Sequence, residues 1–231
     1  MVFIEIYQGM EEEVKSGLEI RLTTCEDFDR LTYINRICFP EQLRWRLPKA
    51  HVRKWWNLLF NSEHCKLWTC SSFGKVVAYN ALVLDRSWYE DVWERQHFSF
   101  FEMLYIFVTC PDIFVKKALT KIKQKRIKKS DTPVDKSGEN QEISTYERIR
   151  KIIAENTPWC GPCGVLPTVR RQGVATKLIQ ICCQTALELG YREMNGCLKR
   201  KNIKSKGLME GLGFTKIDEV DHLLFYRKKL E

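Results

Sequence analysis

Apolar runs long enough to cross a membrane are missing from this 231-residue sequence. The longest stretch without a charged residue, Asn156–Val169, contains Pro158, Pro162 and Pro167. It is shorter than the ~20 apolar residues that a spanning helix needs. The N-terminal residues have no basic region before their apolar start, so no secretory signal is predicted. These observations predict a protein without a membrane span, located in the cytoplasm.

Glycine, proline and histidine are scarce. Twelve Gly and seven Pro exclude a collagen-like or low-complexity chain, and 44% apolar with 29% charged residues is typical of a globular protein. The candidate metal ligands are incomplete, because His64–Cys65 with Cys70 is a partial cluster and Cys160 with Cys163 is a single pair. No metal is therefore expected. The ten cysteines are interpreted as mostly buried free thiols in a reducing compartment.

Acidic residues are absent from one stretch, Phe114–Lys129, which holds eight Lys and Arg residues. Removing those eight charges from the net charge of +9 leaves +1, so the basic character belongs to one segment and not to the whole fold. We interpret the segment as the solvated face of a helix. A clamp for an acidic ligand is one alternative, and contact with a nucleic acid or a membrane surface is another. A nucleic-acid partner is not expected.

Periodic patterns predict a sheet with flanking helices. Strands are predicted at 18–22, 65–72, 76–84, up to 166, 192–198, 214–220 and 222–227, and helices from 24 to before Pro40, at 48–60, 174–189 and 203–210. Hairpins are mixed with one strand–helix–strand unit. The predicted fold class is therefore α/β, with a mixed, mostly antiparallel twisted sheet flanked by helices.

The region 86–156 does not follow this pattern. It is rich in aromatic residues between Trp88 and Phe107, which are interpreted as packing within the insertion or as a lid over a binding site. The basic stretch is predicted to be helical, and 130–142 resembles a flexible linker. The sequence thus predicts one domain, 1–231, with a helical insertion at about 86–156.

The most informative segment is Val165–Leu178, in which a strand leads through a turn rich in Arg, Gln and Gly into a helix. Unpaired amides and the helix dipole attract anions at such a helix start. Gly173 allows a phosphate to approach the backbone, Ala175 is small for the same reason, and Arg170 and Arg171 add positive charge. The segment predicts a diphosphate-binding turn. The alternative is an ordinary strand–helix connection with two solvated arginines.

Three segments in the expected order resemble the GCN5-related N-acetyltransferase (GNAT) superfamily. They are Arg170-x-x-Gly173-x-Ala175 after Val165-Leu166-Pro167, then Asn202 followed by LMEGLGF at 208–214, and the N-terminal EIRLTTCEDFDRL at 19–31. The first resembles the family's acyl-coenzyme A motif. The resemblance covers 18–84 and 164–227, leaves 86–156 as an insertion, and implies a GNAT-like fold.

This resemblance implies an enzyme that transfers an acetyl or larger acyl group from acetyl-coenzyme A directly to an amine. The acceptor would be a small molecule or a peptide, and a homodimer is left open. A backbone amide of Val165 or Leu166 near the thioester oxygen would stabilise an oxyanion. The basic stretch Phe114–Lys129 could alternatively bind the adenosine 3′-phosphate. The implied cofactor contacts are Val165 and Leu166 for pantetheine and the thioester, Arg170, Arg171, Gln172, Gly173, Val174 and Ala175 for the pyrophosphate, and Asn202 for the cofactor or the turn.

The catalytic acid and base are not identified by the resemblance. Many GNAT enzymes have a tyrosine where this chain has Met209, and methionine cannot donate a proton. The stretch 159–166 also has no ionisable base, so water or the distant Tyr226, Tyr79 and Glu102 are the remaining choices. These departures leave a second function open, that of a non-catalytic module that binds acyl-coenzyme A or a polyanion.

A competing motif, Trp159-Cys160-Gly161-Pro162-Cys163, is identical to the active-site pentapeptide of thioredoxin. A Cys-x-x-Cys pair at a helix N-terminus has a lowered thiol pKa. The flanking sequence argues against that context, because the residues before the motif look helical and Cys163 is followed by Gly-Val-Leu-Pro. A thioredoxin-like redox protein is therefore the third interpretation.

Overall fold

The fold is built on one seven-stranded sheet. The computed structural model describes residues 17–94, 108, 149, 151–152 and 156–231. Every neighbouring pair of strands is antiparallel except β4 and β5, which are parallel. In sheet order the strands are β1 (Leu18–Leu22), β2 (Cys65–Ser72), β3 (Lys75–Val83), β4 (Trp159–Val165), β5 (Glu193–Lys199), β7 (Leu223–Lys229) and β6 (Thr215–Val220).

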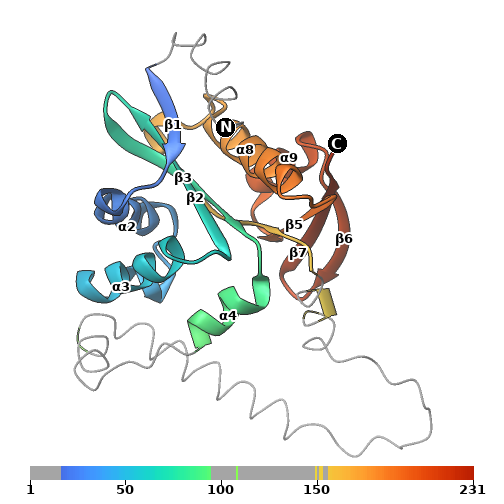
Figure 1. Ribbon diagram of the computed structural model, residues 1–231, viewed down its shortest axis with the longest axis horizontal. Coiled ribbons are helices and arrows are strands. Elements are labelled where there is room, and N and C mark those ends of the chain that lie inside the picture. The colour runs from blue at the N-terminus through green and yellow to red at the C-terminus, as the bar shows by residue number, and fades with distance from the viewer. Residues whose placement is uncertain (1–16, 95–107, 109–148, 150, 153–155) are drawn as a thin grey trace, which may run out of the picture.

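Helices cover both faces of this sheet (Figure 1). One face carries α2 (Phe28–Cys38), α3 (Lys49–Phe60) and α4 (Arg86–Glu94), and the other carries α8 (Val174–Glu188) and α9 (Ile203–Gly211). Side chains alternate along a strand, so two adjacent residues of β3 contact helices on opposite faces of the sheet. Tyr79 donates a hydrogen bond to Asn35 of α2, whereas Asn80 donates to Cys182 of α8.

Tryptophans form the centre of the core on the α2 and α3 side. Trp45, Trp55 and Trp56 are all at most 1% exposed, and the rings of Trp55 and Trp56 lie 4.6 Å apart. The Trp56 indole N–H donates to the hydroxyl of Thr32 at 3.1 Å, so its one polar atom is satisfied. This packing fixes α2 against the sheet and sets where the end of α2 lies.

The predicted start of α2 is confirmed by its hydrogen bonds. The Thr24 amide donates to Oδ2 of Asp27 at 2.8 Å, and Arg21 donates to both Asp27 oxygens at 2.7 and 2.9 Å. One helical turn, Cys25–Asp27, precedes α2, which ends at Cys38, before Pro40. The sequence signals therefore set both ends of this helix.

The predicted fold class is confirmed, as a mixed and mostly antiparallel sheet with flanking helices. Helix α4 follows β3, and the insertion predicted at about 86–156 stays a prediction. The basic stretch, the 130–142 linker, Glu102 and most of the aromatic region lie outside the described residues. Among the described helices, none is both long enough and apolar enough to cross a bilayer.

Candidate functional site

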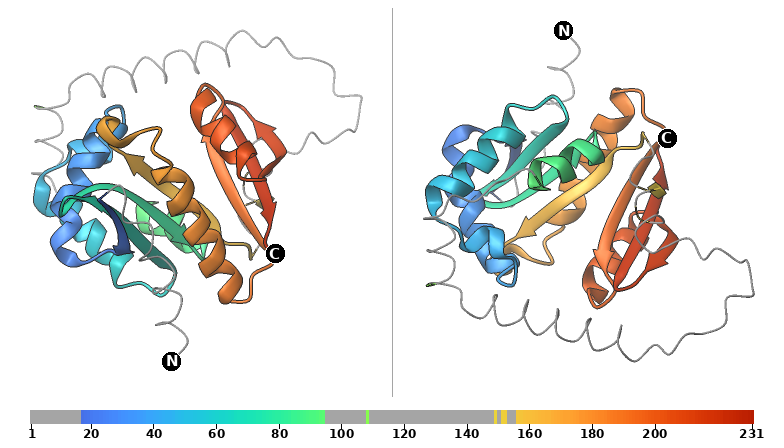
Figure 2. Two further views of the ribbon diagram at one scale, coloured as in Figure 1. Left: turned by 90° about the horizontal axis from the view of Figure 1, so that it is seen from above. Right: turned by 90° about the horizontal axis from the view of Figure 1, so that it is seen from below.

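The two parallel strands in the middle of the sheet separate after a short contact. β4 pairs with β5 at Trp159↔Asn195 and Cys160↔Gly196, and at no further position among the described strand residues. Beyond these pairs the strands diverge toward their carboxyl ends (Figure 2). The second half of β4 therefore presents a strand edge inside the sheet.

A bulge in β4 marks the point of divergence. Two residues, Gly161 and Pro162, stand opposite the single Ala81 of β3, because the register shifts between the pairs on either side. Pro162 has no amide hydrogen to offer a neighbouring strand. A side chain on Gly161 would place Cβ only 3.0 Å from the Ala81 carbonyl oxygen. The Gly-Pro sequence thus creates the bulge and ends the pairing with β5.

Asn80 holds the partner strand at this bulge. At this bulge the Ala81 amide donates to Oδ1 of Asn80 at 3.0 Å. The other end of the side chain donates to Cys182 Sγ at 3.2 Å and lies 3.8 Å from Cys160 Sγ. Asn80 is fully buried. A buried polar group is tolerated where it is hydrogen-bonded, so Asn80 stabilises the irregular stretch and fastens it to α8.

The last residue of β4, Val165, directs its backbone into the divergence. The next amide, that of Leu166, donates to the Val77 carbonyl of β3 at 3.0 Å. Because successive amides along a strand point in opposite directions, the Val165 amide points away from β3. The Leu166 amide is already engaged, so of the two predicted backbone donors only Val165 faces the divergence.

The turn after β4 is tightly folded and open to solvent. Arg171 and Gly173 both have positive φ, 65° and 76°, and a side chain at Gly173 would meet nothing within 4 Å. The first bond within α8 runs from the Lys177 amide to the Gly173 carbonyl at 2.9 Å, and no side chain caps the helix. The amides of residues 174–176 therefore have no partner within the helix. This is the exposed helix start that the sequence predicted.

The other predicted residues lie in this turn or in the first turn of α8. Arg170 donates from Nε to the Val165 carbonyl at 2.9 Å, and Gln172 lies 3.5 Å from the Thr168 carbonyl. Arg170, Arg171 and Gln172 are exposed, Ala175 is half-buried, and Val174 is buried. Two cationic side chains and the positive end of the helix dipole thus meet at one exposed turn.

Asn202 stands just before α9, and Met209 lies within it, beside β5. The Asn202 side chain accepts a hydrogen bond from the Ser205 amide at 3.2 Å and so caps the helix. Met209 is buried, and its Cε occupies the space that a Cβ on Gly196 would need. Of the two roles predicted for Asn202, the structure thus shows the one that steadies the strand–helix turn. Met209 closes α9 against β5 without providing a proton donor.

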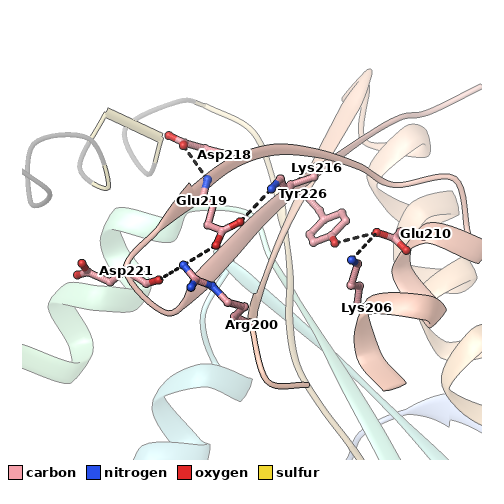
Figure 3. A network of polar contacts seen from close by, with 8 residues as sticks. All are labelled: Arg200, Lys206, Glu210, Lys216, Asp218, Glu219, Asp221 and Tyr226. Carbon is pink, nitrogen blue, oxygen red and sulfur yellow. Dashed lines mark hydrogen bonds and ion pairs between the residues drawn. The ribbon is translucent and has the colours of Figure 1, made fainter. Parts of the chain in front are cut away.

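The candidate proton carriers are engaged elsewhere. The Tyr79 hydroxyl donates to Asn35 at 2.6 Å inside the core, and burial raises its pKa well above the usual value. The Tyr226 hydroxyl donates to Glu210 at 3.1 Å, and burial, followed by the contact with Glu210, raises its pKa (Figure 3). Neither phenol is placed at the divergence by these contacts. The general acid and base remain unassigned.

A polar network fixes the carboxyl end of β5 to the last hairpin (Figure 3). Arg200 follows β5, and its amide donates to the His222 carbonyl at 2.7 Å. Its guanidinium contacts the Asp221 carbonyl and pairs with Glu219, which also pairs with Lys216 at 2.9 Å. The end of β5 is therefore held in place on the side away from β4.

The cysteines of the thioredoxin-like motif lie within strand β4 and not at a helix start. Burial raises the pKa of Cys160 to about 12 and raises the pKa of Cys163 further still. A redox-active pair needs the opposite shift, so the site argues against the redox interpretation. Within the described chain, no group of three or more His, Cys, Asp or Glu residues is arranged to hold a metal ion.

Comparisons with known proteins agree with this geometry. The family model of the acetyltransferase (GNAT) family matches residues 136–214. A search of curated protein sequences finds no match. Solved structures with the same fold include an aminoglycoside N-acetyltransferase, AAC(6′)-Iy, in complex with CoA, at a TM-score of 0.54 and 13% identity over 90% of this chain and 95% of that one.

Two further structures share the fold. An N-acetyltransferase from Staphylococcus aureus has a TM-score of 0.53 and 14% identity over 94% of this chain and 100% of that one. The PaiA N-acetyltransferase of Thermoplasma acidophilum, in complex with coenzyme A, has a TM-score of 0.50 and 10% identity over 92% and 98%. The predicted resemblance is thus confirmed: residues 136–214 match the GNAT acetyltransferase family, and the fold of the described chain is that of GNAT N-acetyltransferases.

Proposed function

We propose that this protein is an N-acetyltransferase that moves an acetyl or other acyl group from acetyl-coenzyme A directly to an amine. The observation that carries the proposal is the divergence of β4 from β5, which leads to the exposed, uncapped start of α8. A strand edge and a helix start at adjacent positions suit a long ligand with amides at one end and phosphates at the other.

The residues present fit such a ligand. The Gly173 backbone is exposed, and the space where a Cβ would stand is empty to 4 Å, so a phosphate can reach the amides of residues 174–176. Arg170 and Arg171 are exposed in the turn that leads to these amides and would pair with phosphate oxygens. This proposal keeps the predicted cofactor contacts of Val165 and of residues 170–175. Asn202 is given an indirect role, because it fixes the turn between β5 and α9 by capping the helix.

The Val165 amide would supply the electrostatic part of catalysis. It points into the divergence, and its strand is fixed by the bulge and by Asn80. A fixed amide aimed at the thioester oxygen stabilises the negative charge that develops there during attack by the amine. Bound acetyl-coenzyme A would supply the activated acyl group. Proton transfer falls to water or to an acceptor group, since Met209 carries no proton.

The test combines binding with turnover. Calorimetry with acetyl-coenzyme A, followed by thiol release in the presence of a panel of amines, is expected to show both binding and acyl transfer. Binding without thiol release for any amine would favour the second candidate, a non-catalytic acyl-coenzyme A module, which the replacement of the usual tyrosine by Met209 supports. Absence of binding would overturn both. The single domain and the cytoplasmic location stay predictions.

A further inference from the structure

One ion pair joins distant parts of the chain at the open end of the divergence. Lys199, the last residue of β5, places Nζ 2.9 Å from Oε1 of Glu41 in the loop after α2. That loop follows Cys38, the last residue of α2, whose Sγ lies 3.3 Å from the carbonyl oxygen of Val165, the last residue of β4. The segment from Cys38 to Glu41 therefore reaches from the end of one diverging strand to the end of the other.

The position of this segment places it on the path of the acceptor. On the opposite face, α8 packs against β3 and β4, and Asn80 bonds to Cys182 of that helix. An amine that attacks a thioester held beside Val165 must then approach from the α2 face of the sheet. The Cys38–Glu41 segment lies on that face, at the ends of the two strands.

The ion pair of Lys199 with Glu41 is weak enough for another ammonium group to replace that of Lys199. The side chains of Lys199 and Glu41 are each 54% exposed, and an ion pair so open to water is weak. The hydrogen bond from Lys199 holds the pKa of Glu41 below its usual range, so this carboxylate is a stable negative charge and a poor proton acceptor. The neighbour of Lys199, Arg200, is fixed to the last hairpin, so the ammonium is presented from a held strand end (Figure 3).

Building on the acetyltransferase function proposed above, we propose that Glu41 determines acceptor specificity by binding a second ammonium group of the acceptor. Lys199 marks that ammonium position in the free protein, and the acceptor's ammonium replaces it. The acceptor class is then a diamine or longer polyamine, with one amine near Val165 and another at Glu41. The exchange leaves Lys199 free in solvent, and no covalent step is involved.

Matched amines test this inference. Putrescine and its isostere pentylamine differ only in a terminal ammonium in place of a methyl group, and cadaverine with hexylamine repeats the comparison at a longer spacing. In Glu41→Gln, the KM for the diamines is expected to rise roughly fivefold, the scale of an exposed ion pair. The KM for the monoamines is expected to stay unchanged.

A second variant predicts a change in the opposite direction. Lys199→Met removes the competing ammonium, so the KM for the diamines should fall while the monoamines are unaffected. Glu63→Gln is the matched control, because Glu63 is a carboxylate with an 89% exposed side chain in another loop. Melting temperatures of all three variants verify that they fold.

The outcomes separate this inference from the function on which it rests. One outcome is that the wild type transfers acyl groups to amines while Glu41→Gln and Lys199→Met change the KM for diamines and monoamines equally or not at all. That result overturns the role of Glu41 and leaves the proposed function intact. Absence of thiol release with every amine overturns the proposed function and the inference together.

Discussion

The Nδ2 group of Asn80 donates to Cys182 Sγ across 3.2 Å and so ties strand β3 to helix α8. The Oδ1 atom of the same side chain accepts a hydrogen bond from the Ala81 amide, opposite the bulge in β4. One buried amide thus stabilises the irregular strand and holds the helix whose start faces the phosphates in the proposed complex. The shape of the proposed binding site thus depends on a residue that need not touch any ligand.

Replacing Asn80 by alanine is expected to destabilise the protein and weaken the binding of acetyl-coenzyme A. The substitution removes the buried hydrogen bonds of Asn80 to the Ala81 amide and to Cys182, which should lower the free energy of unfolding by about 1–3 kcal/mol. Urea unfolding measures the stability, and calorimetry measures the affinity.

Asn57→Ala is the control, because it makes the same change of side chain at an exposed position of α3. Its stability should change little. A stable Asn80→Ala variant with unchanged affinity would contradict the role given to this side chain.

Much of the fold follows from local patterns, because those patterns report local physics. The capping arrangement of Thr24 and Asp27, the apolar stripe of α3 and the Gly173 turn each depend on residues within a few positions of one another. The predicted strands and helices are accordingly found close to the expected positions. The start of α8 was predictable for the same reason.

The Trp159–Cys163 stretch shows where a local pattern misleads. The same five residues stand at a helix start in thioredoxin, whereas here Gly161 and Pro162 form a strand bulge, and the half-buried thiols have a raised pKa. A proline inside a central strand is itself a signal for a bulge. Asn80, a single amide within the apolar run of β3, was a second signal for an irregular site.

Long-range contacts left no signal in the sequence. Glu41 and Lys199 are 158 positions apart, and each looks like an ordinary surface charge in its own segment. The contact of the Leu166 amide with Val77 likewise depends on the register between β3 and β4. Such contacts are fixed only once the strands pair, so the sequence alone did not distinguish Val165 from Leu166.

The Gly173 backbone gives a test of the anion-binding turn. Gly173→Ala places a side chain at φ 76°, and the left-handed conformation should destabilise the fold by about 1 kcal/mol. The new methyl group also stands where a phosphate would approach the helix start, so the affinity for coenzyme A should fall. Chemical unfolding and calorimetry measure the two effects.

Gly207→Ala is the matched control for Gly173→Ala. Gly207 lies within helix α9 and also has nothing within 4 Å of a Cβ, but its φ is not positive. This variant should gain up to about 1 kcal/mol of stability, since alanine is the better helix former. Its affinity for coenzyme A should equal that of the wild type. A Gly173→Ala variant with normal affinity would exclude phosphate binding at this turn.

The motif thiols are expected to react slowly with alkylating agents. With the pKa of Cys160 raised to about 12 by burial, almost no thiolate is present at pH 8. Cys25 is exposed and serves as the internal control. Timed iodoacetamide labelling followed by peptide mass spectrometry should show Cys25 modified well before Cys160 and Cys163. Faster labelling of the motif pair would restore the redox interpretation.

The Arg21–Asp27 contact predicts how stability depends on pH. Burial alone would raise the pKa of Asp27, but the hydrogen bonds from Arg21 and the Thr24 amide outweigh it, and the pKa is lowered. A carboxyl with a lowered folded-state pKa contributes stability above its unfolded value, about 3.9, and loses it as the pH falls through the folded value.

Asp27→Asn should therefore be less stable than the wild type at pH 7, by about 1–3 kcal/mol, because a charged acceptor of four hydrogen bonds is lost. The difference should shrink as both proteins are acidified below pH 4, where the wild-type carboxyl becomes protonated too. Asp29→Asn is the control, since Asp29 is 44% exposed and pairs with Lys49 at the surface. Urea unfolding across this pH range measures both, and a difference that stays constant would show that the charge of Asp27 does not stabilise the start of α2.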